Sequence, residues 1–245
     1  MNYKLLEVES RLFNCCIIQL ADDIEASDYA REEKSLLDNE NPYYIQHQLD
    51  AADLSGIHAF ESLGFRFVEF RISRYLQPIN PAASSKYSYP YAVELIGDSP
   101  ENRKAIIGIA SQHNSDDRFT RDPLIPDQLA KKRLELYITK SLQSFPRQFV
   151  YGLYNQHNNE LLGFRTGIFA DSTVVKYFYY FMKPAYNNSQ YISILETGVH
   201  EALLRRKVTR IEAITSGFNV DEMNESSLMQ GFVVDKTMVL LRKIF

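Results

Sequence analysis

The chain of 245 residues is short of glycine, of cysteine and of long apolar runs. Its 10 glycines are about 4% of the residues against a usual 7%. It contains neither a GxGxxG nor a Walker A pattern, which argues against a generic phosphate-binding loop. No apolar run approaches the roughly 20 residues of a spanning helix, and the N-terminus carries acids where a signal peptide is apolar. We therefore expect a cytoplasmic protein with no membrane partner.

Metal and nucleic-acid chemistry also lack their usual signals. The only cysteines, Cys15 and Cys16, are adjacent in sequence and rarely bridge as neighbours, so we expect reduced thiols on a half-buried strand. The five histidines show no metal-ligand spacing, and we expect no metal. A net charge of −4 gives no global attraction to nucleic acid. The ordinary hydrophobic content of 45% fits a globular protein with a sizeable core.

One short pattern occurs twice in the chain. Residues 60–65 (FESLGF) and residues 227–232 (SLMQGF) each end a helix-like segment and open a strand-like run. In both copies a glycine, Gly64 or Gly231, stands where a helix ends in a positive backbone angle, and a phenylalanine starts the strand. Because each copy closes a series of alternating strands and helices, we interpret the pattern as an internal duplication.

The two repeats divide the chain into two α/β units. We expect a first domain at residues 1–76, a linker rich in proline, serine and alanine at 77–90, and a second domain at 91–245. The expected strands are 13–20, 43–49, 65–74, 92–96, 149–154, 161–168, 173–182, 211–214 and 233–241, with a hairpin across residues 157–159. The expected helices are 25–37, 54–63, 100–110, 126–142, 192–203 and 221–229. In the fifth of these, Ile192, Leu195, Val199 and Leu203 follow at steps of three, four and four and mark one apolar face. Strand pairs followed by alternating helices and strands predict a mixed α/β sheet.

The loop at residues 116–126 has an unusual density of charge. It places three aspartates and two arginines around Phe119, just before a long amphipathic segment. One reading is a solvated capping loop whose Asp and Arg side chains pair with each other. The other is a loop that holds a ligand, because such a polar segment costs chain entropy and buries little. The sequence is compatible with both interpretations of the loop.

The order DRFxxDPxxP, followed by a helix with a tyrosine near its end, resembles the GNAT superfamily of acetyl-CoA-dependent N-acyltransferases. Within it, the similarity is to the TDP-fucosamine acetyltransferase type, which acetylates a nucleotide-linked amino sugar. The two helix–Gly-Phe–strand endings agree with this resemblance. It implies tandem GNAT-like units, of which the N-terminal copy is reduced and lacks a cofactor site and the C-terminal copy is complete.

The resemblance implies an acetyl-CoA site in the second unit. In the family, a splayed strand pairs with the pantetheine arm and polarises the thioester, and amides at a helix N-terminus hold the pyrophosphate. The positions that match are Phe181, Met182 and Lys183 on the strand, Asn187, Asn188, Ser189, Gln190 and Tyr191 at the helix start, and Asn219. Gln190 and Ile192 replace the two family glycines. Their side chains hinder close approach, whereas Asn188 or Ser189 can cap the helix and leave amides free. Asn219 is equally an N-cap for residues 221–229.

The resemblance also implies the remaining roles. Ser227 stands where family members often have a tyrosine as general acid, and Tyr180 and Tyr179 are further acid candidates. Asp117, Arg118, Phe119 and Asp122 fall on the substrate side, where an arginine would pair with phosphate and an aromatic ring would stack on a base or sugar. The implied partner is a small-molecule amine, a nucleotide sugar in surface polysaccharide synthesis being the preferred acceptor, and a homodimer is the expected assembly.

The sequence is therefore compatible with two functions. The first is an N-acyltransferase that moves an acetyl or short acyl group from CoA to a primary amine. The second is a GNAT-fold protein that has lost CoA binding and acts as a binding or assembly module. The missing glycines and the serine at position 227 motivate the second.

Overall fold

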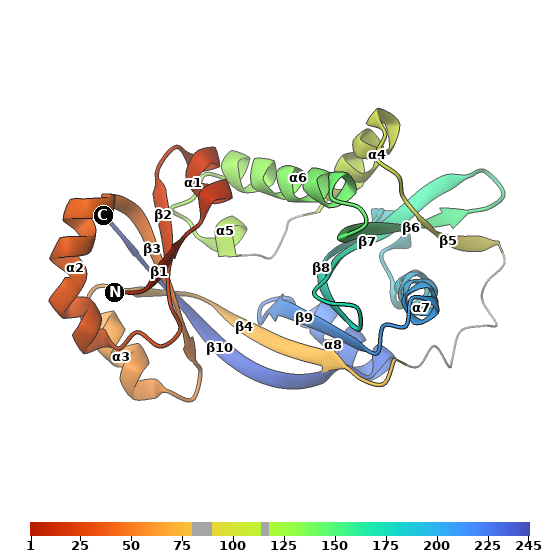
Figure 1. Ribbon diagram of the computed structural model, residues 1–245. Coiled ribbons are helices and arrows are strands. Elements are labelled where there is room, and N and C mark those ends of the chain that lie inside the picture. The colour runs from red at the N-terminus through yellow and green to blue at the C-terminus, as the bar shows by residue number, and fades with distance from the viewer. Residues whose placement is uncertain (80–89, 114–117) are drawn as a thin grey trace.

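A computed structural model describes residues 1–79, 90–113 and 118–245, and within these it leaves the side chains of residues 225–229 undescribed. The described strands form one ten-stranded mixed sheet in the order β1-β2-β3-β10-β4-β9-β8-β7-β6-β5 (Figure 1). The pairs β2–β3 and β8–β9 are parallel, and the other neighbouring pairs are antiparallel. The predicted mixed α/β sheet is confirmed.

The N-terminal elements are β1 (Tyr3–Leu5), α1 (Glu7–Phe13), β2 (Cys16–Leu20), α2 (Ala26–Glu40), β3 (Pro42–Asp50), α3 (Leu54–Ser62) and β4 (Arg66–Leu76). Our prediction from the sequence missed α1, a helix of seven residues, and wrongly began the following strand at residue 13. The helix ends at Asn14, whose φ of 52° lies in the left-handed region that asparagine tolerates. Cys15 and Cys16 are free and half-buried, as expected.

The later elements are β5 (Tyr91–Leu95), α4 (Pro100–Ala110), α5 (Arg118–Arg121), α6 (Asp127–Gln143), β6 (Gln148–Asn155), β7 (Glu160–Phe169), β8 (Val174–Met182), the 3-10 helix η2 (Pro184–Tyr186), α7 (Ser189–Arg205), β9 (Arg210–Ser216), α8 (Val220–Gln230) and β10 (Val233–Ile244). Apart from α5 and η2, each lies within a few residues of its predicted range. Of the helices in the described ranges, none is long and apolar enough to span a bilayer.

Each of the two Gly-Phe repeats is followed by a strand that pairs with strands of the other half of the sheet. Gly64 and Gly231 have φ values of +92° and +77°, which confirms the predicted positive angles. β4, which follows the first repeat, pairs with β9 of the second half, whereas β10, which follows the second, pairs with β3 of the first half. β4 and β10 also pair with each other. The division into domains of 1–76 and 91–245 stays a prediction, and it cuts across a continuous sheet.

Helices cover both faces of the second half of the sheet (Figure 1). On one face, α7 buries Ile192, Leu195, Val199 and Leu203, the stripe predicted from their spacing. On the other face, α4 and α6 pack against β6, β7 and β8. Part of the predicted linker is in the core, because Ile79 packs in the α7 cluster; residues 80–89 lie outside the described residues.

β8 separates from its parallel neighbour β9 halfway along its length. The two strands pair from Val174↔Arg210 to Tyr177↔Ala213, and β8 then continues to Met182 without that partner. At the same place β8 has two residues, Phe178 and Tyr179, opposite the single Thr166 of β7. Such a bulge bends a strand and increases its twist. The bulge and the loss of pairing together open the predicted splay near Met182.

Candidate active site

Beyond the end of its pairing with β9, β8 lines a cavity of about 200 Å³, which we call the splay cavity. Residues 178–182 of β8 form one wall, and Asn187, Asn219, the first turn of α8 and His113 complete it. The cavity shares His113 with a second one of about 570 Å³ beside α4 and α6. It shares Phe178 and Tyr179 with a third of about 480 Å³, which α6, β4 and β9 also line. The splay is therefore bordered by two larger hollows on the α6 side.

The backbone of β8 presents only alternate residues to this cavity. The Lys183 N–H donates to the Leu162 carbonyl at 2.7 Å, so its amide is used in the pairing with β7. Because hydrogen bonding alternates along an antiparallel pair, the amide and carbonyl of Met182 face the opposite side, toward the cavity. Of the three strand residues predicted to meet the cofactor, Met182 thus has the available backbone, whereas Lys183 does not.

His113 contacts this available backbone directly. Its Nε2 lies within hydrogen-bonding distance of the Met182 carbonyl oxygen, and its ring packs 5.6 Å from that of Phe181. A carbonyl can only accept, so Nε2 is the donor in this contact. Our sequence interpretation missed this histidine, because no pattern marked it beyond its place just before the charged loop.

The start of α7 is a neutral, exposed helix N-terminus. The Asn188 side chain accepts from the Tyr191 N–H at 3.4 Å, which confirms the expected cap. Residues 187–190 are exposed, and the first turn has no acid. In the first turn of a helix the backbone N–H groups have no intrahelical partner, which leaves amides there for an anion.

The two side chains at the family's glycine positions do not enter the cavity. Gln190 is exposed, and Ile192 is 5% exposed and packs in the core against the sheet. Tyr191 makes an edge contact with Tyr186, at 5.0 Å between ring centroids, and another with Tyr91. None of the three lines the splay cavity. The side chains that replace the two glycines therefore leave the splay cavity clear, and the first turn of α7 carries no acid that would repel an anion.

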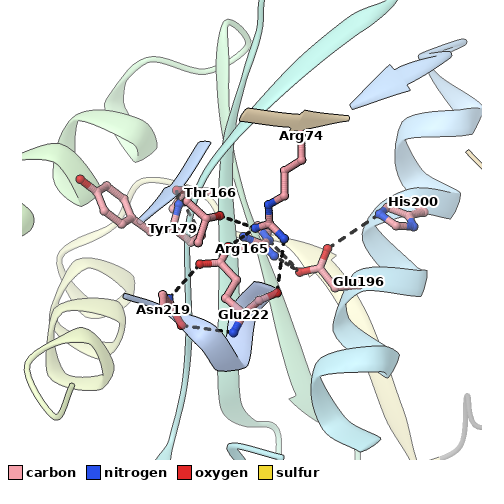
Figure 2. Close-up of polar contacts among 9 residues, drawn as sticks. Arg74, Arg165, Thr166, Tyr179, Glu196, His200, Asn219 and Glu222 are labelled. Carbon is pink, nitrogen blue, oxygen red and sulfur yellow. Dashed lines mark hydrogen bonds and ion pairs between the residues drawn. The ribbon is translucent and has the colours of Figure 1, made fainter. Parts of the chain in front are cut away.

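Asn219 is the N-cap of α8, as one of its two interpretations predicted, and its contact with a cofactor stays a prediction. Its Oδ1 accepts from the Glu222 N–H at 3.2 Å, and its Nδ2 donates to Glu222 Oε2 at 2.9 Å, which makes it the N-cap of α8. It also lines the splay cavity. Figure 2 shows Glu222 beside both Asn219 and Arg74, whose guanidinium lies 2.7 Å from Oε1 of the carboxylate. The cap is thereby tied to β4, the exchanged strand.

A buried ion pair supports the wall behind β8. Arg165 of β7 donates from Nε to Glu196 of α7 at 2.7 Å, and both side chains are almost fully buried (Figure 2). The Arg165 guanidinium stacks on the rings of Tyr177 and Tyr180, 4.6 and 4.8 Å from their centroids. Burial lowers the pKa of the neighbouring His200 to about 4, with a further contribution from Arg165. The ring of Tyr180, a predicted catalytic residue, is therefore in stacking contact with Arg165.

The predicted substrate residues are not brought together at one surface. Phe119 is 0% exposed and contacts Phe13, 5.5 Å away between centroids, so its ring is occupied by the interior. Asp122 is paired with Arg242 of β10 at 2.9 Å. Arg118 alone of this group lines a cavity, the one of about 480 Å³. Asp117 lies outside the described residues, as does the side chain of Ser227, whose backbone lies in α8.

Comparison with known proteins identifies the fold. No protein-family model matches the chain, and no curated protein matches it. A GCN5-related N-acetyltransferase from Sphaerobacter thermophilus superposes with a TM-score of 0.67, at 15% identity, over 99% of this chain and 76% of its own. A tandem GNAT protein from the clavulanic acid biosynthesis pathway has a TM-score of 0.60, at 11% identity, over 89% of this chain and 69% of its own.

A conserved protein of unknown function from Staphylococcus epidermidis is also similar, with a TM-score of 0.65 at 12% identity over 94% of this chain and 84% of its own. At these identities the likeness concerns the fold. The chain has a GNAT-like fold with one mixed sheet of ten strands, and its structural neighbours include N-acetyltransferases and a tandem GNAT. Across the described residues, no group of three or more His, Cys, Asp and Glu side chains is placed to hold a metal ion.

Proposed function

We propose that the protein is an N-acyltransferase that moves an acetyl or short acyl group from CoA to a primary amine. The observation that carries the proposal is the splay of β8 from β9, with the Met182 backbone facing the cavity beside a neutral, exposed N-terminus of α7. A GNAT-like fold alone does not require either feature, so the presence of both in this chain supports the proposal.

Acetyl-CoA, when bound, supplies the acyl group as a thioester, so that an amide bond forms as the C–S bond breaks. The chain's own groups have separate parts in this. First-turn amides of α7 favour the pyrophosphate, because the helix dipole and unpaired N–H groups attract anions. The Met182 amide is positioned to donate to an oxygen that gains negative charge in the cavity.

Two proton positions are needed, one for the amine and one for the thiolate. His113 can take a proton at Nδ1, because Nε2 is held by the Met182 carbonyl. Tyr180 and Ser227 remain the proposed donors toward sulfur. An amino sugar on a nucleotide diphosphate remains the proposed acceptor, and a reduced first unit, a complete second unit and a homodimer the proposed organisation.

Isothermal titration with acetyl-CoA tests the proposal. We expect saturable binding in the micromolar range that Asn188→Trp weakens at least tenfold, since a bulky ring would cover the amides. Asn39→Trp, a matched change of an exposed asparagine on α2, should leave the affinity unchanged. If millimolar acetyl-CoA fails to bind, the second function, a non-catalytic binding module, replaces the first.

Restoring glycine sharpens the same choice. Gln190→Gly is the informative variant, because Gln190 is exposed, whereas Ile192→Gly would also remove a core side chain at a cost of about 2–5 kcal/mol. In a working enzyme Gln190→Gly should change the affinity for acetyl-CoA less than threefold. If that variant binds and the natural chain does not, the protein has lost its cofactor site.

A further inference from the structure

The cavity of about 480 Å³ brings arginines from three distant parts of the chain to one place. Arg71 comes from β4, Arg118 from α5 and Arg133 from α6. Lys140 and Lys176 also line it, giving five cationic side chains. The acidic side chains in the lining are three, Glu69, Glu212 and Glu222. The walls therefore carry more positive than negative charge.

Two of these acids are paired with arginines outside the cavity. Glu222 binds Arg74 at 2.7 Å, and Glu212 binds Arg210 at 2.9 Å. Glu212 also lies 3.6 Å from Lys176, and Glu69 lies 3.8 Å from Arg71. Arg133 has a further acid outside the lining, Glu9 of α1, at 2.9 Å. The five lining cations thus outnumber the three lining acids, two of which are also bound by arginines outside the lining.

Arg71 and Arg118 differ in their partners among the described residues. The Arg118 Nε is buried and has no hydrogen-bond partner there. Arg71 donates to Gln48, a neutral amide, at 2.6 Å. The pKa of Arg71 is lowered to about 10, first by burial and then by the charge of Arg118, while Glu69 acts in the opposite direction. An anion in this cavity would offset the repulsion between the two like charges.

We propose that this cavity binds an oxyanion, a phosphate or a carboxylate, and that Arg71 and Arg118 are its main ligands. Guanidinium groups offer paired N–H donors that match such anions. The proposal rests on the proposed acyl transfer for its purpose: the anion is part of the amine acceptor. The cavity shares Phe178, Tyr179 and Asn219 with the splay cavity. An acceptor anchored by its anion at the arginines therefore extends toward the Met182 backbone and His113.

This assignment differs from the one that the charged loop predicted. Of the four residues on that loop, Arg118 alone is retained, and its partner Arg71 lies 47 positions earlier on the exchanged strand. Because β4 belongs to the first half of the chain, the acceptor site of the second half would be incomplete without it. The first half then contributes to recognition even though it has no cofactor site of its own.

Titration calorimetry with inorganic pyrophosphate, inorganic phosphate and malonate tests the site. Each titration is done with saturating CoA present, so that the α7 helix end is occupied. We expect pyrophosphate or malonate to bind the natural chain, and Arg118→Gln and Arg71→Gln each to weaken that binding about tenfold or more. Arg118→Lys keeps the positive charge but lacks the paired N–H donors of the guanidinium group, so it should bind the anion more tightly than Arg118→Gln and less tightly than the natural chain.

Arg103→Gln is the matched control, because Arg103 on α4 is paired with Asp98 outside this cavity. It should leave anion binding unchanged, and thermal melting should show that every variant remains folded. Preference for pyrophosphate over malonate assigns a phosphate group, and the reverse assigns a carboxylate. Failure of all three probes to bind, or binding that survives both Arg118→Gln and Arg71→Gln, overturns the proposal.

The acetyl-CoA titration separates this inference from the proposed function. Arg118→Gln should leave the affinity for acetyl-CoA within twofold of the natural chain. If acetyl-CoA binds and the anions do not depend on the arginines, the cavity assignment fails and the acyltransferase stands. If acetyl-CoA does not bind while the arginine-dependent anion site does, the acyltransferase fails and the anion site stands.

Discussion

The two halves of the molecule contain the same arrangement of a parallel strand pair and a helix, with opposite electrostatics. In the first half α2 follows β2, and in the second α7 follows β8. The α2 end is preceded by Asp22 and Asp23, has Glu25 at its N-cap position without a side-chain cap hydrogen bond, and has Asp28 in its first turn. The α7 end begins Asn-Asn-Ser-Gln and has no acid in its first turn. The acids at the α2 end would repel a phosphate, and the α7 end lacks them.

The strands differ in the same direction. β2 has five residues and ends with its pairing to β3, whereas β8 has nine, carries a bulge and continues past its pairing with β9. The two halves therefore differ in local charge and in the bulge of the strand, although the order of these elements is alike. Changes made to one half at a time should show whether the halves are as separate in stability and in ligand binding as their sequences suggest.

The largest effect should come from removing the exchanged strand β10. Deleting residues 233–245 takes away the partner of both β3 and β4, and with it the buried Leu240 and Leu241. We expect loss of the folded state in both halves. Circular dichroism and amide dispersion in NMR measure this. A truncated chain whose first half stays folded would show that the halves are independent.

The next effect is on acid stability, and each half contributes one histidine. Burial lowers the pKa of His47 in the first half and of His200 in the second to about 4. Since an unfolded histidine titrates near 6.5, only the unfolded chain binds the proton between pH 6.5 and 4. Stability should therefore fall as pH drops through this window, by about 2 kcal/mol per histidine between pH 7 and 5.

Urea unfolding at pH 7 and pH 5 measures that loss. His47→Leu and His200→Leu should each remove about half of the difference between the two pH values, because each deletes one of the two groups. His58→Leu, which changes an exposed histidine on α3, is the control and should leave the difference intact. A pH dependence that both buried variants retain in full would contradict the assignment.

A smaller effect should follow from giving α7 the charge of α2. Ser189→Asp places an acid in the first turn, where it occupies the positive end of the dipole and repels a phosphate. We expect the affinity for acetyl-CoA to fall about tenfold, or about 1.4 kcal/mol, with stability unchanged or slightly increased. Ser189→Asn is the neutral control. Equal binding by both variants would place the cofactor elsewhere.

The smallest effect concerns the stability contribution of Arg118. If the charged loop merely caps a helix, Arg118→Ala should cost a surface amount of about 0–1 kcal/mol. If the arginine serves a ligand, stability should hardly change, and the apparent Michaelis constant for an anionic acceptor should rise tenfold or more. Thermal melting beside anion titration of this variant decides between them: a large drop in melting temperature with unchanged binding would make the loop structural.

Local patterns were sufficient for most of the elements. The spacing of Ile192, Leu195, Val199 and Leu203 predicted the buried face of α7, because a helix repeats every 3.6 residues. The Asn-rich turn after residue 156 predicted the β6–β7 hairpin, whose Asn159 has a φ of 54°. The short α1 was missed, since seven residues give too little periodicity to recognise a helix.

The candidate site could be predicted only in part, because its members are distant in sequence. The cap at Asn188 and the strand at Met182 were found from their neighbours. The contact of His113 with Met182 joins residues 69 positions apart, and the pair of Asp122 with Arg242 joins residues 120 apart. No local pattern reports such contacts, so Phe119 was predicted as a stacking surface although packing buries it completely.

The sequence by itself determined the class of fold, the order of elements, the two glycine turns and the neutral start of α7, because each depends on residues within a few turns of one another. The tertiary structure alone decided that β4 and β10 are exchanged, that β8 leaves β9 after Tyr177 and that Arg71 and Arg118 line one cavity. Strand order and register come from the summed burial of residues far apart in the chain, and this sum exists only once the sheet has formed.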